Sequence, residues 1–273
     1  MYSMFSALAT DPYAMAGFPI FGTGASGGKY AAGAIFSFTP QGDYQIRHSF
    51  CSEPNCADGS TPVSGLTFMW KCDRVVWVGT TTAGGANGHG TIFQANRFGC
   101  LGTCSYGTQG ILYNFCSLPG CADGAAPNSV PVGFALGNQP IYGTTPSGGA
   151  NGQGVIYRLH VAKGEYSVLH DFCSSESCAD GSAPTGLIKS PRGGTYFGAT
   201  QGGGANQSGT VFSLEGKTNV FSTFYSFCSQ PECVDGQTPT AGPLPSLQGM
   251  LYGTTAAGGT GAVGTVFGIH SSK

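Results

Sequence analysis

One block of sequence recurs five times along this 273-residue chain, and the recurrence constrains the fold more than any other feature. In its clearest copy the block reads Leu-Tyr-Gly-Thr-Thr at residues 251–255, then a glycine-rich turn, then Gly-Thr-Val-Phe at residues 264–267. The central glycines of the five copies are Gly22, Gly79, Gly143, Gly198 and Gly253. Their spacings of 57, 64, 55 and 55 residues fill the chain. Such a period is typical of repeat architectures, in which each unit folds as one supersecondary element.

Each repeat contains four short runs with β-strand character, separated by clusters of Gly, Pro, Asn and Asp. In the fourth repeat these runs are Thr185–Ile188, Thr195–Thr200, Thr210–Leu214 and Val220–Phe227. No segment shows a sustained apolar period of 3.6 residues, so we expect almost no helix. The pattern predicts an all-β fold, a five-bladed β-propeller of four-stranded antiparallel blades, with a β-solenoid as the alternative. The expected repeat units are residues 9–50, 51–115, 116–172, 173–227 and 228–273.

The two ends of the chain match each other. The last repeat stops after its third strand, Gly264–Ile269, and residues 2–8 resemble the missing fourth strand. We therefore expect the N-terminal strand to pair with the last blade, which closes the ring and leaves no open sheet edge. On this interpretation residues 1–273 form a single β-propeller domain.

A second repeated element, Phe-Cys-x4-Cys-x-Asp-Gly-x-x-Pro, lies between the copies of the first. It supplies the pairs Cys51/Cys56, Cys116/Cys121, Cys173/Cys178 and Cys228/Cys233. Zinc takes four ligands, and each pair offers two with no recurring histidine beside it, so we expect local disulfides and no metal or other cofactor. Each Asp-Gly loop offers a calcium ion only one Asp side chain, which is too few ligands unless backbone oxygens also bind. Paired cysteines indicate an oxidising compartment.

Three further cysteines, Cys72, Cys100 and Cys104, lie in variable turns of the second repeat. We expect one bridge among them. Because 11 cysteines is an odd number, at least one thiol stays free or pairs outside the chain. No histidine motif accompanies it that would activate a nucleophile.

Both repeated loops are expected on one rim of the propeller, because successive connections of an antiparallel meander alternate between its two ends. If the protein binds a ligand, this rim is the candidate site. The candidate ligand-binding residues are Asn87, His89, Asn151, Gln153, Asn206, Gln207, Asp58, Asp123, Asp180 and Asp235. A structural role stays open for them, since Asn tolerates left-handed backbone and Asp before Gly caps its own turn. His48 and His170, each two residues before a Phe-Cys pair, are expected to pack or hydrogen-bond within strands.

Composition and motifs exclude several functional classes. Charged residues make up 9% of the chain, the net charge is −2, and the 11 Lys and Arg are scattered singly, so a nucleic-acid partner is not expected. No run of 18 apolar residues predicts a membrane span. Nucleophile elbows, zinc-protease motifs, phosphate loops and EF-hands are absent from the sequence. Repeated equivalent carboxylates lack the asymmetric acid and base that glycoside hydrolysis needs. We expect no catalytic residues, although an enzyme stays open.

The blocks L-Y-G-T-T, G-G-A-N-G-x-G, G-T-V-F and D-G-x-x-P resemble the GloVer-type tandem repeat of the "choice-of-anchor" exported protein family. The resemblance covers nearly the whole chain. It implies an exported protein, and it brings no established activity and no catalytic residues.

The sequence thus favours a secreted, disulfide-stapled propeller that acts as a multivalent, lectin-like binding module, with carbohydrate as the favoured ligand. Its expected partners are glycans or another extracellular or cell-surface molecule. One alternative is a structural or cell-surface interaction protein without a small ligand. The other is a propeller glycoside hydrolase or lyase with its site in the central channel.

Overall fold

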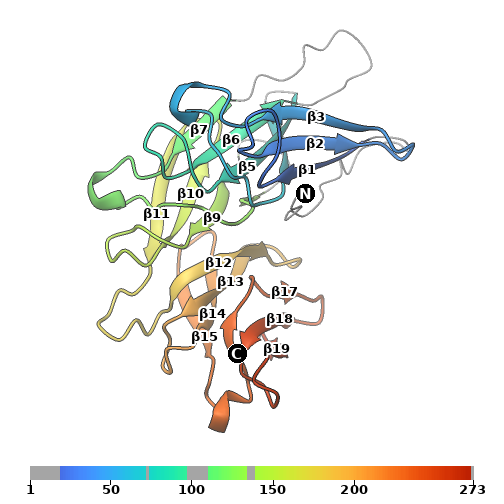
Figure 1. Ribbon diagram of the computed structural model, residues 1–273. Helices are drawn as coiled ribbons and strands as arrows, with labels where there is room; N and C mark the ends of the chain where they lie inside the picture. The colour runs from blue at the N-terminus through green and yellow to red at the C-terminus, as the bar shows by residue number, and fades with distance from the viewer. Residues whose placement is uncertain (1–18, 72–73, 97–109, 134–138, 272–273) are drawn as a thin grey trace. The chain divides into compact units, whose positions relative to one another are not determined.

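The computed structural model describes residues 19–71, 74–96, 110–133 and 139–271 (Figure 1). In this part of the chain all regular structure is β-strand, apart from three short 3-10 turns. These turns lie inside Cys-x4-Cys loops, at η1 (Pro54–Cys56), η2 (Pro119–Cys121) and η3 (Pro231–Cys233). The prediction of an all-β fold with almost no helix is confirmed for the described residues.

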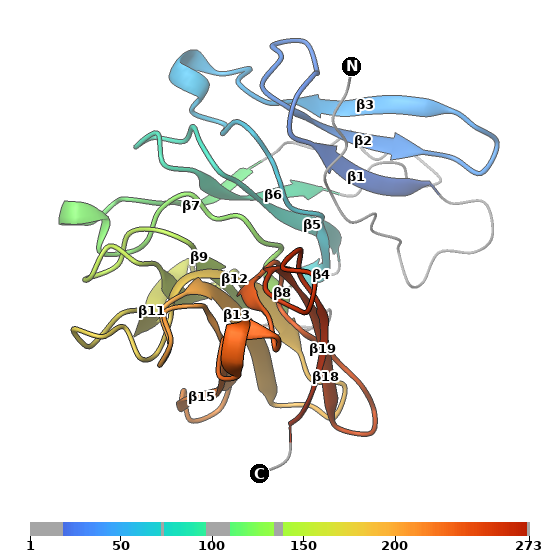
Figure 2. The ribbon, with the colours of Figure 1, turned by 60° about the horizontal axis from the view of Figure 1, so that its bottom comes forward.

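The strands pair mainly with their sequence neighbours, in one three-stranded and four four-stranded sheets (Figure 2). The first sheet contains β1 (Ile20–Gly24), β2 (Ala34–Phe38) and β3 (Tyr44–Ser49). The second contains β4 (Thr67–Lys71), β5 (Arg74–Thr81), β6 (Thr91–Asn96) and β7 (Gly110–Asn114). The third contains β8 (Val132–Gly133), β9 (Ile141–Thr145), β10 (Val155–His160) and β11 (Glu165–Asp171). The fourth contains β12 (Ser182–Lys189), β13 (Thr195–Gly202), β14 (Thr210–Glu215) and β15 (Phe221–Ser226). The last contains β16 (Gln237–Pro239), β17 (Leu244–Pro245), β18 (Met250–Ala257) and β19 (Val266–His270). Each repeat therefore folds as one blade-like antiparallel meander.

The chain packs as two compact units. Among the described residues, one comprises those in the ranges 19–119, 125–141 and 158–166, and the other comprises those in the ranges 120–124, 142–157 and 167–271. The sheets of the first two repeats belong to the first unit, and those of the last two repeats belong to the second.

The four strands expected in the fourth repeat are present, and their ends differ from the expected ones by up to three residues. The largest difference is at the start of the first strand. β12 begins at Ser182 rather than at Thr185, because Pro184 already pairs with Thr200 before the register shifts. Proline is tolerated there because β12 is an edge strand of its sheet, where a missing N–H need not break the ladder.

The central glycine of the repeated block makes room for an aromatic ring on the neighbouring strand. A Cβ atom on Gly198 would lie 2.3 Å from Cζ of Phe212, and a Cβ on Gly253 would lie 2.3 Å from Cζ of Phe267. Both rings are largely buried. The Gly in the second strand and the Phe in the third strand are therefore one packing unit, which explains why the sequence repeats them together.

Two phenylalanines that precede Cys-x4-Cys loops join neighbouring repeats. Phe50 meets Phe93 edge to face at 5.1 Å between ring centroids, and Phe172 meets Phe212 at 5.2 Å. All four side chains are fully buried. Aromatic pairs of this geometry contribute about 1 kcal/mol beyond the area they bury, so they stabilise the junctions between repeats.

The last sheet exposes side chains that its counterparts bury. Val266 on β19 is 76% exposed, whereas the equivalent Val211 on β14 is fully buried. Tyr252 on β18 is 48% exposed, whereas the equivalent Phe197 is 5% exposed. Among the described strands, β19 pairs with β18 alone. Residues 2–8, the expected closing strand, lie outside the described residues.

Candidate functional site: the repeated turns and Cys loops

Backbone hydrogen bonds join the glycine-rich turn of a repeat to its Cys loop. The carbonyl oxygen of Cys56 accepts hydrogen bonds from the N–H groups of Gly59, at 2.8 Å, and Gly85, at 2.9 Å. The carbonyl of Cys178 accepts the equivalent bond from Gly204 at 2.8 Å. The two loops that the sequence places on one rim therefore form a continuous surface within a repeat, which we call the turn-and-loop surface.

Three asparagines of the glycine-rich turns share one hydrogen bond. In each, Nδ2 donates to a phenylalanine carbonyl at 3.0 Å: Asn87 to Phe115, Asn151 to Phe172, and Asn206 to Phe227. All three asparagines are exposed, and Oδ1 has no hydrogen-bond partner among the described residues. One end of each amide thus secures the turn, while the other end can accept a hydrogen bond from a ligand.

His89 and Gln153 occupy equivalent places near the end of their turns, and both are exposed. Their main-chain carbonyls accept hydrogen bonds from Ala126, at 2.8 Å, and Ala183, at 2.9 Å. Their backbones therefore bind the start of the next repeat, whereas their side chains are exposed.

Gln207 does not share the place of Gln153. It stands where the second repeat has Gly88, with a left-handed backbone at φ 56°. Its Nε2 donates to the carbonyls of Ser177, at 2.6 Å, and Gly204, at 3.3 Å. Its side chain is thus bound to the adjacent Cys loop.

The repeated aspartates are bound within their own loops. Asp58 accepts hydrogen bonds from the N–H of Ser52 at 3.0 Å, from the Ser52 hydroxyl at 2.8 Å and from Nε2 of His48 at 3.1 Å. Asp180 has equivalent bonds from Ser174 and His170, and Asp235 has them from Ser229 and Tyr225. Asp123 is fully buried. Asp58, Asp180 and Asp235 thus hold their loops against the last strand of the preceding repeat.

Burial and hydrogen bonding shift the pKa values of these groups. Burial lowers the pKa of His48 below its ordinary value of 6.5, against the opposing effect of Asp58. Burial likewise lowers the pKa of His170, against the opposing effect of Asp180. For Asp58, burial acts to raise the pKa, but hydrogen bonds from Ser52 outweigh it and leave the pKa below 3.8. At neutral pH the neutral imidazoles of His48 and His170 thus donate to carboxyl oxygens of Asp58 and Asp180.

The Ser, Asp and His of these loops are not arranged for nucleophilic catalysis. An activated serine donates its hydroxyl proton to a histidine base. Here the Ser52 hydroxyl donates to Asp58, and His48 bonds to that same carboxylate oxygen. The aspartate at the centre is a structural acceptor.

All eight cysteines of the Cys-x4-Cys loops are disulfide-bonded, as the sequence predicts. Bridges join Cys51 to Cys56, Cys173 to Cys178, and Cys228 to Cys233. Cys116 and Cys121 are bonded too. These bridges fit an oxidising compartment. Cys72, Cys100 and Cys104 lie outside the described residues.

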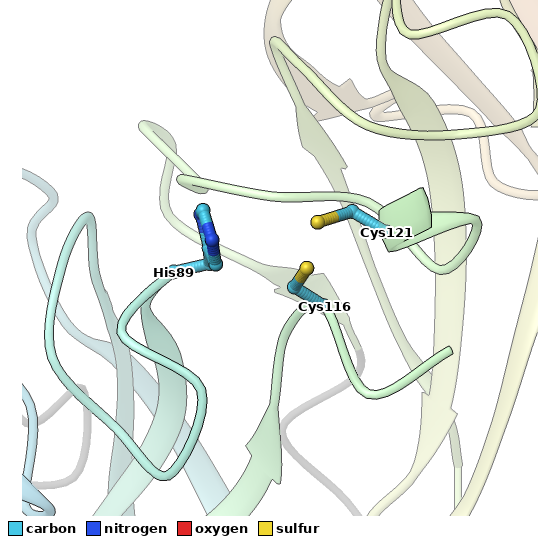
Figure 3. Close-up of side chains that lie close together, drawn as sticks. All are labelled: His89, Cys116 and Cys121. Carbon is cyan, nitrogen blue, oxygen red and sulfur yellow. The ribbon is translucent and has the colours of Figure 1, made fainter. Parts of the chain in front are cut away.

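One group of potential metal ligands occurs in the described part of the chain. Ring nitrogen and sulfur atoms of His89, Cys116 and Cys121 all lie within 4.8 Å of one another (Figure 3). Both sulfurs are in a disulfide, and a disulfide has no thiolate to offer a metal. The oxidised protein therefore has no metal centre here.

Sequence reasoning identified His48 and His170 as equivalent strand residues but did not connect them to the aspartates. Tyr113 and Tyr225 stand at the same place, two residues before Phe-Cys. The shared signal is a ring that carries a hydrogen-bond donor, ten residues before the Asp of the loop. A search for any ring with a donor, His or Tyr, ten residues before each Asp would have predicted the contact between the ring and the aspartate.

Comparisons with known proteins support this architecture. The family described as the Gloeobacter/Verrucomicrobia repeat matches residues 19–267. No curated protein matches the chain in sequence. No helix in the described residues has the length and apolar character needed to cross a membrane.

Solved structures with a related fold include TolB from Acinetobacter baumannii, with a TM-score of 0.51 and 13% identity over 92% of this chain and 50% of that one. TolB from Agrobacterium tumefaciens gives a TM-score of 0.45 and 12% identity over 93% of this chain and 70% of that one. The GH43 endo-arabinanase from Bacillus licheniformis gives a TM-score of 0.38 and 11% identity over 97% of this chain and 92% of that one. The chain spans half the length of the first of these. That likeness shows a propeller-like fold of repeated blades and nothing about activity.

Proposed function

We propose that this chain, which belongs to the Gloeobacter/Verrucomicrobia repeat family, is an exported, multivalent binding module whose ligand is carbohydrate. The four disulfide pairs support an oxidising, extracellular location. The favoured partners are glycans on a cell surface or in the extracellular medium.

The three equivalent asparagines are the observation that carries the proposal. Each has its amide nitrogen anchored at 3.0 Å to a main-chain carbonyl and its Oδ1 unpartnered among the described residues. A rigidly held amide oxygen accepts a hydrogen bond from a sugar hydroxyl without a large entropic cost. Three weak sites on one scaffold together bind a polymeric glycan more tightly than any single site does.

The scaffold that we propose for these sites is a single five-bladed ring, closed by residues 2–8 as the fourth strand of the last blade. The exposed Val266 and Tyr252, whose counterparts are buried, support a missing covering strand. Deletion of residues 2–8 is expected to lower the melting temperature and to promote self-association through the uncovered edge. A deletion variant with unchanged melting temperature and monomeric size would contradict closure.

A glycan array probed with the intact protein tests the binding function. Asn87, Asn151 and Asn206 are then replaced together by Ala, and circular dichroism checks that the fold persists. The expected result is binding that is present in the wild type and lost in the folded triple variant. Absence of binding to every glycan would reject the proposal.

A structural, ligand-free surface protein is the second candidate, and the aspartates favour it. Asp58, Asp180 and Asp235 direct their hydrogen bonding to their own loops, which stabilises the repeat without any ligand. This candidate predicts no binding to any glycan on the array, together with a loss of stability when any of these aspartates is replaced by Ala.

A further inference from the structure

Two tyrosine rings lie face to face within the first compact unit. Tyr113 on β7 and Tyr166 on β11 have ring centroids 3.8 Å apart and planes only 6° apart. Aromatic pairs in proteins usually have centroids about 4.5–7 Å apart, offset or edge to face. At 3.8 Å the facing ring carbons are in van der Waals contact. Both residues are partly exposed, so an oxidant in solution can reach them.

A third ring holds this pair in place. Phe115, which is fully buried, meets Tyr113 edge to face at 5.4 Å and Tyr166 at 6.0 Å between ring centroids. The Tyr113 hydroxyl is also hydrogen-bonded to the hydroxyl of Ser117 at 2.9 Å. The two phenols therefore stay in contact without any movement of the strands that carry them.

The same arrangement of three rings recurs in the second compact unit with different chemistry. His170 stacks on Phe221 at 3.8 Å and 4°, and Phe172 meets these two rings edge to face at 4.9 Å and 5.8 Å. In this arrangement His170 takes the place of Tyr113, and Phe221 takes the place of Tyr166. The stack is thus a packing feature of the repeat, and the first unit differs in placing two phenols in it.

We propose that Tyr113 and Tyr166 are an oxidative modification site, at which a one-electron oxidant joins the two rings in a dityrosine crosslink. The oxidant is hydrogen peroxide acting through a haem peroxidase. Each phenol loses one electron and one proton, and these reduce one peroxide to two water molecules. A carbon–carbon bond then forms between ring carbons next to the two hydroxyls. The hydrogens of those carbons leave as protons and return to the two oxygens, which restores both phenols. This modification does not depend on glycan binding.

Geometry and exposure distinguish this pair from a second close pair of tyrosines. Tyr142 and Tyr196 have centroids 4.4 Å apart, their planes are tilted by 35°, and each residue is 5% exposed. Burial raises the pKa of Tyr196 to about 12, so its phenol proton leaves less readily. Oxidation should therefore select the flat, partly exposed pair.

Peroxidase treatment of dilute protein tests the proposal. After an equimolar amount of hydrogen peroxide has reacted, size-exclusion chromatography removes molecules that are crosslinked to one another through exposed tyrosines such as Tyr44. The monomer is then analysed for dityrosine fluorescence, for the loss of two hydrogen atoms in its mass, and for crosslinked peptides. The expected product is one crosslink between the peptides that contain Tyr113 and Tyr166.

The matched variant is Tyr166→Phe, because Phe221 stands at the equivalent place of the other stack. Circular dichroism checks that this variant folds. Its monomer should show at least about tenfold less dityrosine fluorescence, because Tyr113 then has no second phenol in contact and the advantage of proximity is lost.

A transplanted pair provides a second variant. His170→Tyr together with Phe221→Tyr places two phenols in the stack of the second unit and should add a crosslink between the peptides that contain these two positions. Absence of a crosslink in the wild-type monomer, an undiminished yield in folded Tyr166→Phe, or a crosslink mapped to Tyr142 and Tyr196 instead would each overturn the proposal. A folded double variant without the added crosslink would overturn it too, since stacking would then not determine reactivity.

Discussion

The ring of His170 lies flat against that of Phe221, with centroids 3.8 Å apart and planes 4° apart, while its Nε2 donates to Asp180 at 3.0 Å. In the following repeat a tyrosine makes the same kind of bond, since the hydroxyl of Tyr225 donates to Asp235 at 2.7 Å. Histidine and tyrosine are thus interchangeable as ring donors in this position. They differ in that only histidine titrates near neutral pH.

The pH dependence of stability should reflect the two histidines. Burial lowers the pKa of His48 and of His170 below 6.5, so the unfolded chain takes up protons before the folded chain does. Below pH 6.5 the unfolded state therefore binds more protons, and the free energy of unfolding falls as the pH falls. Denaturant melts at pH 7.5, 6.5 and 5.5 should show this loss.

The control is the double variant His48→Tyr and His170→Tyr, which keeps the ring and the donor but removes the titration. Its stability should be nearly constant between pH 7.5 and 5.5. It should still fall near pH 4 and below, because hydrogen bonds hold the pKa of Asp58 below 3.8 and this stabilisation is lost as the carboxylate protonates. An unchanged slope above pH 5.5 would refute the role of the histidines.

Replacement of Gly198 by Ala should destabilise the fold strongly. The new Cβ would lie 2.3 Å from Cζ of Phe212 and 2.6 Å from the carbonyl oxygen of Gly186, so a fully buried ring must shift. Overpacking of this kind costs about 1–3 kcal/mol. Chemical denaturation measures the loss. The matched control is Gly261→Ala, where the new Cβ meets Val263 at an ordinary 3.6 Å and stability should change by less than about 0.5 kcal/mol.

Much of this fold could be predicted from the sequence because its periodicity is strong. The strand runs of the fourth repeat and the Cys-x4-Cys disulfides depend on local pattern and short spacing, which a single sequence contains. The start of β12 at Ser182 could not be predicted, because it depends on the pairing of Pro184 with Thr200 on another strand.

The candidate site was less accessible to sequence reasoning. The sequence pattern around Asn151 or Asp180 would be the same whether the side chain binds a ligand or binds the backbone of its own loop. The structure separates them by their partners: within the described ranges Asn151 has no partner for Oδ1, while Asp180 accepts hydrogen bonds from Ser174 and His170.

Removal of one disulfide should reveal how much these short bridges stabilise the protein. Cys173 and Cys178 close a loop with a separation of five residues, and both have left-handed backbone, at φ 57° and 47°. The chain-entropy relation gives about 2 kcal/mol for so short a loop. The double variant Cys173→Ser and Cys178→Ser should lose this amount in denaturant melts. Reduction of the wild type should lower stability further, because all of its bridges then open.

The Tyr225 hydroxyl offers a separate test of the loop anchors. It donates to Asp235 at 2.7 Å and contacts the Ser229 hydroxyl at 2.8 Å, so Tyr225→Phe removes one charge-assisted hydrogen bond and leaves the ring packing on Phe227 intact. The expected cost is about 1 kcal/mol at neutral pH.

Burial acts to raise the pKa of Asp235, but hydrogen bonds from Tyr225 and Ser229 keep it below 3.8. Loss of the hydroxyl should therefore shift the acid limb of the stability profile to higher pH. Tyr30→Phe, at an exposed tyrosine of a glycine-rich turn, should change neither quantity, and an equal effect of the two substitutions would show that the Asp235 contact does not stabilise the loop.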